Sequence, residues 1–164
     1  MATFIPIILS NWCTSIDGLH FSATEFYSLV EQRIKDRKIP DTSAKRISLS
    51  QTGILSAKRE YLRVNRKDYS FDICAAPFGT QFFVSWWFGE RAGFLKELLA
   101  KIPIIGPLFI RYNQSKTYYQ LDTEAMFREA IRQCVLDAID SITKEKGLRS
   151  LSDLDRQPQK ATSK

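Results

Sequence analysis

The sequence predicts an α+β fold, in which a four-stranded antiparallel meander carries an N-terminal helix and a long C-terminal helix on one face. Two observations lead to this prediction. Between residues 45 and 88, apolar and polar side chains alternate with period two, as they do in half-buried strands. Before and after that region, apolar residues recur at helical spacing, so each flanking segment has one apolar stripe. A sheet with one apolar face supplies the surface that both stripes need.

Length and composition agree with one domain. The chain has 164 residues, of which 44% are hydrophobic and 26% are charged. That hydrophobic share is too high for an intrinsically disordered chain, and the length is sufficient for a hydrophobic core. We expect a single domain over residues 1–147, with an apolar insertion at 92–112, and a flexible polar tail over 148–164.

The first helix is predicted over residues 23–37. Ser22 and Glu25 have the spacing of a capping box, in which the cap hydroxyl and the glutamate satisfy backbone N–H groups of the first turn. Pro40 follows the end of the segment. The apolar stripe of this helix consists of Phe26, Leu29, Val30 and Ile34.

The second helix is predicted to begin after Asp122, which can cap it, and to end before Gly147. Cys134 lies within its apolar stripe, so we interpret this cysteine as a small buried hydrophobic residue and not as a reactive thiol. The stripe consists of Phe127, Ala130, Ile131, Cys134, Val135, Ala138, Ile139 and Ile142.

Between the helices, strands are predicted at 45–51, 55–64, 69–76 and 81–88. Turns at 52–53, 65–68 and 77–80 connect them. The hairpin registers that follow from these turns agree with one another, because all three place the apolar residues on one face of the sheet. That face contains Ile47, Leu49, Leu62, Val64, Tyr69, Phe71, Ile73, Phe82, Val84, Trp86 and Phe88.

The opposite face of the predicted sheet mixes arginines with aromatic side chains. Such a mixture suits a protein partner, for which Trp, Tyr and Arg dominate binding energetics, and it also suits single-stranded nucleic acid. A third interpretation is that the rest of the chain covers this face and that Asp72 pairs with Arg63 or Arg59. The candidate binding residues on this face are Arg46, Arg59, Tyr61, Arg63, Asp72, Phe83 and Trp87.

The positive charge of the chain is concentrated in one region. The formal net charge is +6, and residues 31–68 alone hold eleven Lys or Arg against five acidic residues, which accounts for the whole excess. A basic patch favours acidic partners such as nucleic acid or an anionic membrane surface. Besides the sheet-face arginines, the patch contains Arg33, Lys35, Arg37, Lys38, Lys45, Lys58, Arg66 and Lys67.

Residues 92–112 combine a short amphipathic stretch with a Pro/Gly-broken apolar run. The uncharged run 102–110 has nine residues, whereas a helix needs about 20 to span a bilayer, so we predict no transmembrane helix. The segment is interpreted as part of the core, as a contact for a partner or a second copy, or as an insertion into a membrane interface. Its candidate contact residues are Phe94, Leu98, Ile102, Ile104, Ile105, Leu108 and Phe109.

The N-terminal segment 3–9 is apolar, and we interpret it as an edge strand or a docked arm. Three cysteines, an odd number spread over separate predicted elements, favour a reducing, cytoplasmic compartment, with peripheral membrane association as an alternative. His20 is the only histidine and is interpreted as a solvated loop residue. No phosphate-binding glycine motif, catalytic triad or metal-ligand spacing is present, so we predict no catalytic residues, no metal and no cofactor.

These observations favour a non-enzymatic binding or scaffold module over an enzyme. The Arg/aromatic sheet face and the 92–112 segment are then the contacts for a protein partner or for a homo-oligomer. The first alternative is a nucleic-acid-binding domain that uses the basic 31–68 patch. The second alternative is a peripheral protein at an anionic membrane surface.

Overall fold

The computed structural model describes residues 6–50, 58–91 and 116–160. In these ranges the chain forms an antiparallel sheet and two helices, as the sequence predicts. In chain order the elements are β1 (Ile7–Asp17), α1 (Ala23–Asp36), β2 (Ser43–Ser50), β3 (Lys58–Arg66), β4 (Tyr69–Phe78), β5 (Gln81–Glu90), α4 (Tyr118–Glu145) and β6 (Gln159–Lys160).

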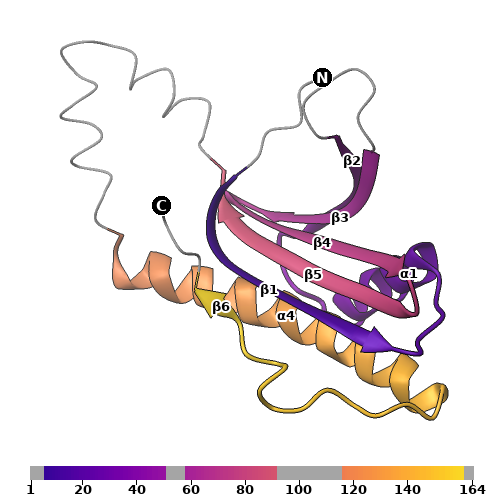
Figure 1. Cartoon of the computed structure of the whole chain (residues 1–164). Helices are drawn as coiled ribbons and strands as arrows, with labels where there is room; N and C mark the ends of the chain where they lie inside the picture. Colours follow the sequence, from indigo (N-terminus) through magenta and orange to yellow (C-terminus); the bar gives the residue numbers. More distant parts are fainter. Residues whose placement is uncertain (1–5, 51–57, 92–115, 161–164) are drawn as a thin grey trace.

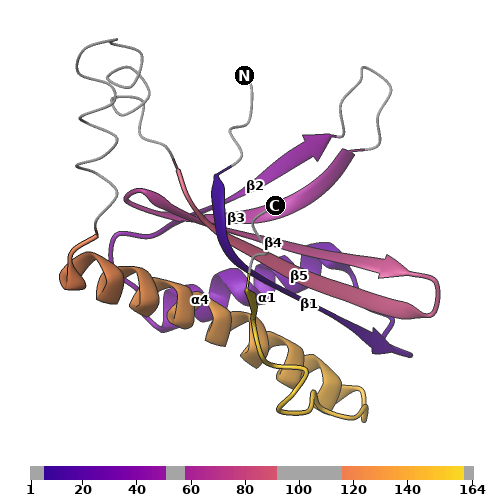
Figure 2. The same cartoon turned by 60° about the vertical axis from the view of Figure 1, so that its left-hand side comes forward.

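Both helices lie on the same face of the sheet (Figures 1 and 2). The strand order is β2-β3-β4-β5-β1-β6, and all neighbours are antiparallel. The meander β2 to β5 is therefore confirmed, and β1 adds a fifth long strand beside β5. The sequence predicted an edge strand or arm at 3–9, but the strand extends to Asp17 because Trp12 and Ile16 point into the core between polar neighbours.

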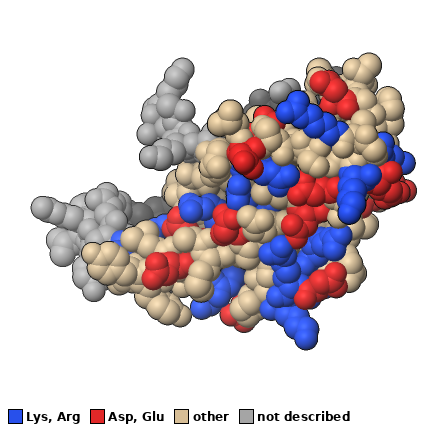
Figure 3. All heavy atoms as spheres, turned by 90° about the horizontal axis from the view of Figure 1, so that it is seen from below, with Lys and Arg blue, Asp and Glu red and all other residues tan. Residues whose placement is uncertain are grey.

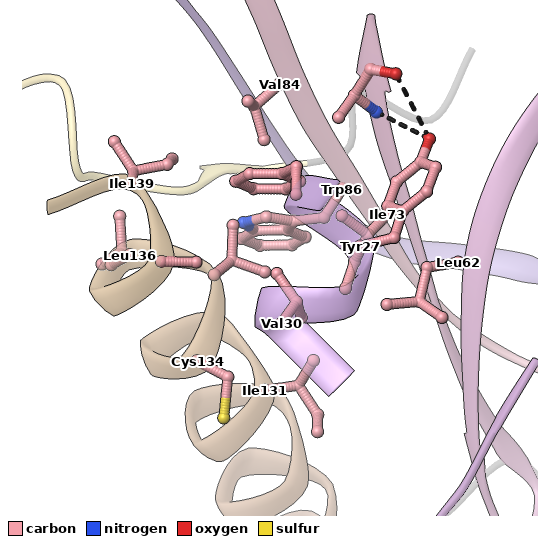
Figure 4. Close-up of a cluster of buried hydrophobic side chains, with 14 of the residues drawn as sticks. Tyr27, Val30, Leu62, Ile73, Val84, Trp86, Ile131, Cys134, Leu136 and Ile139 are labelled. Atoms are coloured by element: carbon pink, nitrogen blue, oxygen red, sulfur yellow. Dashed lines mark hydrogen bonds between the residues drawn. The ribbon is translucent and has the colours of Figure 1, made fainter. Parts of the chain in front are cut away.

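The core lies between the sheet and the two helices. Figure 4 shows Trp86 and Ile73 from the sheet packed against Val30 of α1 and Ile131 of α4. Nine of the eleven apolar residues that the sequence assigned to the helix-covered face are buried there, and the exceptions are on β2. Cys134 is fully buried in the α4 stripe, as predicted.

The two described hairpin turns are shorter than predicted. Arg66 pairs with Tyr69, so Lys67 and Asp68 alone form the β3–β4 turn, and Phe78 pairs with Gln81 at the β4–β5 turn. Each register therefore differs from the predicted one by two residues. Because a shift of two returns every side chain to its original face, the predicted faces of β3, β4 and β5 are correct. The predicted turn at 52–53 lies outside the described residues.

The predicted faces of β2 are wrong. Arg46 pairs with Leu62 and Ile47 pairs with Tyr61, whereas the prediction placed Ile47 beside the core residues of β3. Directly opposite residues share a face, so Arg46 lies on the helix-covered face, and Ile47 and Leu49 lie on the other. The β2–β3 connection could not be derived from the sequence, and an odd shift in its length exchanges the two faces.

The β2–β3 hairpin diverges from the rest of the sheet and rises away from the helices (Figures 1 and 2). A hydroxyl group from α1 fills the gap where β3 and β4 separate. The Tyr27 hydroxyl donates to the Glu60 carbonyl at 2.9 Å and accepts from the Ala75 N–H at 2.9 Å. Tyr27 is completely buried, and burial raises the pKa of its phenol. The Tyr27 hydroxyl thereby takes the place of a direct backbone hydrogen bond between β3 and β4 where the two strands separate.

The long helix begins earlier than predicted. Thr117, and not Asp122, is its N-cap, and Gln120 completes a capping box with Thr117. The Thr-x-x-Gln spacing is visible in the sequence, but the first turn of α4 holds exposed Tyr118 and Tyr119, which do not belong to the apolar stripe. An apolar stripe alone therefore marks where a helix packs and not where it begins.

The segment after Gly147 returns along the sheet. The Trp12 Nε1–H donates to the Asp155 carbonyl at 2.6 Å, and Arg156 makes two hydrogen bonds to Asp140 of α4, at 2.7 and 3.1 Å. The short strand β6 then pairs with β1. The part of the predicted tail that the structure describes thus contacts β1 and α4.

Candidate binding surface

The face of the sheet turned away from the helices is the candidate site, and we call it the second sheet face. No described helix lies over it (Figures 1 and 2). Strand pairing brings together six of the seven residues that the sequence assigned to it. It consists of Lys45, Ile47, Leu49, Arg59, Tyr61, Arg63, Ser70, Asp72, Cys74, Phe83, Ser85 and Trp87, continued on β1 by Asn11, Cys13 and Ser15.

A buried ion pair occupies the centre of this face. Arg63 Nε donates to Asp72 Oδ1 and Arg63 Nη2 donates to Asp72 Oδ2, both at 2.6 Å. The two residues are directly opposite on β3 and β4 and are 6% and 4% exposed. The geometry is that of a two-point guanidinium–carboxylate pair, which fixes both side chains. Asp72 is therefore paired, as one of the interpretations from sequence proposed, and the charge of Arg63 is balanced inside the protein.

Accessible aromatic and aliphatic side chains lie on the same face as that pair. Trp87 lies opposite Asp72 on β5 and is 40% exposed, although it is a large apolar side chain. Tyr61 and Phe83 are half-buried, and so are Ile47 and Leu49, which the β2 register adds to this face. The surface thus combines a rigid polar centre with apolar contact area.

Arg46 does not belong to this face. Its guanidinium lies 3.4 Å from both Glu31 of α1 and Glu60 of β3 and stands over the Tyr27 ring, 4.9 Å from its centre. It also donates to the Ser28 hydroxyl at 3.2 Å. Arg46 therefore attaches the β2–β3 hairpin to α1 and is a structural residue in this fold.

Arg59 lies at the exposed end of the second sheet face, opposite Leu49. Its guanidinium interacts with the Tyr61 hydroxyl and the Cys74 thiol. Burial is the largest influence on both groups and raises the pKa of Tyr61 and of Cys74 despite the nearby positive charge. Neither group is therefore ionised near neutral pH, which gives no sign of a nucleophile here.

The predicted basic patch is divided among several places. Arg33, Lys35, Arg37 and Lys38 lie at the end of α1, and Arg66 and Lys67 lie at the β3–β4 turn. A hydrogen bond from Arg66 Nε to the Pro40 carbonyl, at 3.2 Å, brings these two groups together. Lys45 is on the second sheet face, and Lys58 is at the far end of β3.

Acidic residues neutralise part of this patch. Arg37 pairs with Asp137 of α4 at 2.5 Å, and the Arg33 guanidinium donates to the Ser141 hydroxyl. An open hollow beside the end of α1 is lined by Lys35 and Lys38 but also by Glu31. Figure 3 shows Lys and Arg intermixed with Asp and Glu over the helical side of the molecule. That side does not present one uninterrupted positive surface.

The sequence missed an exposed apolar group at the start of α4. Tyr118, Tyr119 and Met126 are 87%, 76% and 64% exposed. They lie outside the buried stripe of the helix, and only the Thr117 capping box would have placed Tyr118 and Tyr119 on a helix.

Just before α4, Lys116 connects three elements. Its ammonium lies 2.8 Å from Glu90 of β5 and 2.7 Å from Glu124 of α4, and it stands 5.4 Å from the centre of the Tyr69 ring. Burial disfavours its charged form, but the two carboxylates outweigh burial, so the pKa of Lys116 is raised.

The predicted apolar contacts at 92–112 lie outside the described residues. Within the described ranges, no helix is long and apolar enough to cross a membrane. In the same ranges, no three His, Cys, Asp or Glu side chains gather as metal ligands would. Cys13 is exposed, Cys74 and Cys134 are buried, and burial raises the pKa of Cys134 to about 11.

Comparison with known proteins gives no match. No family model fits the chain, and neither a curated protein nor a solved structure matches it significantly.

Proposed function

We propose that this protein is a non-enzymatic binding module whose second sheet face receives a protein partner. One observation carries the proposal: Trp87, Tyr61, Phe83, Ile47 and Leu49 are accessible together on a sheet face that no described helix covers. Trp, Tyr and Arg are the residues that most often dominate protein interfaces, especially near the centre of a patch.

The buried ion pair supports a binding role more than a catalytic one. Arg63 and Asp72 hold each other in a fixed geometry, and the neighbouring Cys74 and Tyr61 have raised pKa values. A rigid surface loses little side-chain entropy on association, which favours affinity. A catalytic site would instead need a nucleophile or base that is active near neutral pH.

Nucleic-acid binding is the weaker alternative. Three of the arginines that it requires are in ion pairs, Arg37 with Asp137, Arg46 with Glu31 and Glu60, and Arg63 with Asp72. Phosphate binding by these residues would have to replace existing carboxylate contacts. If nucleic acid is the partner, affinity for a single-stranded oligonucleotide falls steeply with salt and depends on Arg59.

The test is capture of a partner from native extract by the purified protein, compared with two variants. Trp87→Ser removes the central exposed aromatic side chain, and Tyr119→Ser is the matched control, because Tyr119 is 76% exposed but lies on α4, away from the second sheet face. We expect a defined protein partner that is lost with Trp87→Ser and retained with Tyr119→Ser. Equal capture by all three proteins, or recovery of nucleic acid alone, would refute the proposal.

A further inference from the structure

The two edges of the sheet differ in the described segments that lie beside them. At the β1 edge, β6 pairs with Ser10 and Asn11, and the segment before β6 accepts a hydrogen bond from the Trp12 side chain. At the other edge, β2 has one described neighbour, β3. In an antiparallel pair, about half of the residues of each strand point their N–H and C=O groups away from the partner. The outer side of β2 is therefore a row of backbone donors and acceptors.

β2 is regular enough to accept another strand. Its eight residues pair with β3 without a bulge, and it contains no proline. Bulges and prolines are among the usual devices that prevent an edge strand from pairing with another chain. The hairpin also rises from the sheet and is held to α1 through Arg46, which fixes the position of this edge.

The side chains along β2 show what kind of strand fits. On the second sheet face, exposed Lys45 is followed by half-buried Ile47 and Leu49, and exposed Arg59 lies opposite Leu49 on β3. Lys45 makes no ion pair with any residue in the described ranges. The whole positive excess of the chain also lies within residues 31–68, which include β2.

We propose that β2 receives an extended segment of a protein partner as an added strand, and that this segment places an acidic residue beside Lys45 and apolar residues beside Ile47 and Leu49 on one face. The inference rests on the proposed function and names the partner's chemistry. Backbone hydrogen bonds supply affinity in this mode of recognition, and the alternate side chains supply specificity. A second copy of β2 fits less well, because pairing would bring two like-charged strands together.

A synthetic heptapeptide, Glu-Thr-Val-Thr-Val-Thr-Glu with blocked ends, is the probe. It places two valines between two glutamates on one face, and it reads the same in both directions. A second peptide has Lys in place of Glu, and a third has N-methyl groups on alternate amides, which removes backbone donors. Binding to the full chain is measured by fluorescence anisotropy, and hydrogen–deuterium exchange locates the bound peptide.

We expect the acidic peptide to bind and to slow amide exchange within 43–50, and we expect the lysine and N-methyl peptides not to bind. Lys45→Glu should weaken binding by about fivefold or more, whereas Lys144→Glu, the same change at an exposed residue of α4, should have little effect.

Three results would overturn the inference. The first is equal weakening by Lys45→Glu and Lys144→Glu, which indicates general attraction to a basic protein. The second is slowed exchange outside β2, or no binding of the acidic peptide. The third is a dimer that protects β2 in the absence of peptide. If Trp87-dependent capture persists in any of these cases, the proposed function stands and only the β2 mode is wrong.

Discussion

At the scale of single residues, Arg63 and Asp72 are the most informative pair in the molecule. Both charges are removed from water, and two short hydrogen bonds join them. Burying such a pair costs desolvation energy, so its value lies less in net stability than in fixing the register and the surface of β3 and β4.

We predict that Asp72→Ala lowers the free energy of unfolding by about 3–5 kcal/mol, because it leaves a buried guanidinium without its carboxylate. Replacing both partners, Arg63→Met with Asp72→Leu, should cost much less. The measurement is urea unfolding of the single and double variants. Arg37→Met is the control, since the side chains of Arg37 and Asp137 are each 40% exposed, and it should change stability by less than about 1 kcal/mol. An equal loss in the single and double Asp72 variants would contradict this account.

The sequence could predict the acid–arginine neighbourhood at this point but not the other arginine contacts. Asp72 is on the same predicted face as Arg59 and Arg63, and either pairing was consistent with the pattern. The observed register, which is shifted by two residues from the predicted one, places Arg63 directly opposite Asp72. Arg46 was misplaced because the length of the β2–β3 connection, which decides the face of every β2 residue, could not be derived from the sequence.

At the scale of elements, the terminal segments contribute more to the packing of the fold than their composition indicates. β1 supplies Trp12 and Ile16 to the core, and the 148–160 segment covers its outer edge. Only two residues of β6 pair with β1, and the segment is also attached by the hydrogen bond from Trp12 to Asp155, by the ion pair between Arg156 and Asp140, and by Leu148 and Leu151, which pack against the core.

We predict that removal of residues 148–164 lowers the free energy of unfolding by about 1–3 kcal/mol, because the buried Trp12 N–H loses its acceptor. Thermal unfolding and tryptophan fluorescence are the measurements, and a red shift is expected as Trp12 meets water. Arg156→Gln is a milder variant that should show a smaller loss. A truncated chain with an unchanged melting temperature and emission spectrum would show that the segment is not attached in solution.

The strands of the meander could be predicted because alternation survives an even error in register. The β3–β4 and β4–β5 turns have two residues each, where four were predicted, and the apolar faces remained correct. The same alternation failed for β2, since Ile47 and Leu49 are apolar but lie on the second sheet face. A pattern of apolar residues cannot distinguish the core from an exposed contact surface.

At the scale of the whole molecule, the helices cover one face of the sheet, and no described helix covers the other. The positive charge is less uniform than the sequence indicates, because acidic residues of α1, β3, β4 and α4 neutralise Arg37, Arg46 and Arg63. The cations Lys45 and Arg59 remain exposed on the second sheet face beside its apolar residues. This combination is the reason for proposing a protein partner.

The most direct test of that proposal is photo-crosslinking in native cells. A photoreactive phenylalanine analogue replaces Trp87 in one protein and Met126 in another, because Met126 is 64% exposed on α4, away from the second sheet face. We predict a discrete crosslinked protein adduct from position 87 and none from position 126. The same adducts from both positions, or no protein adduct from position 87, would contradict the central claim.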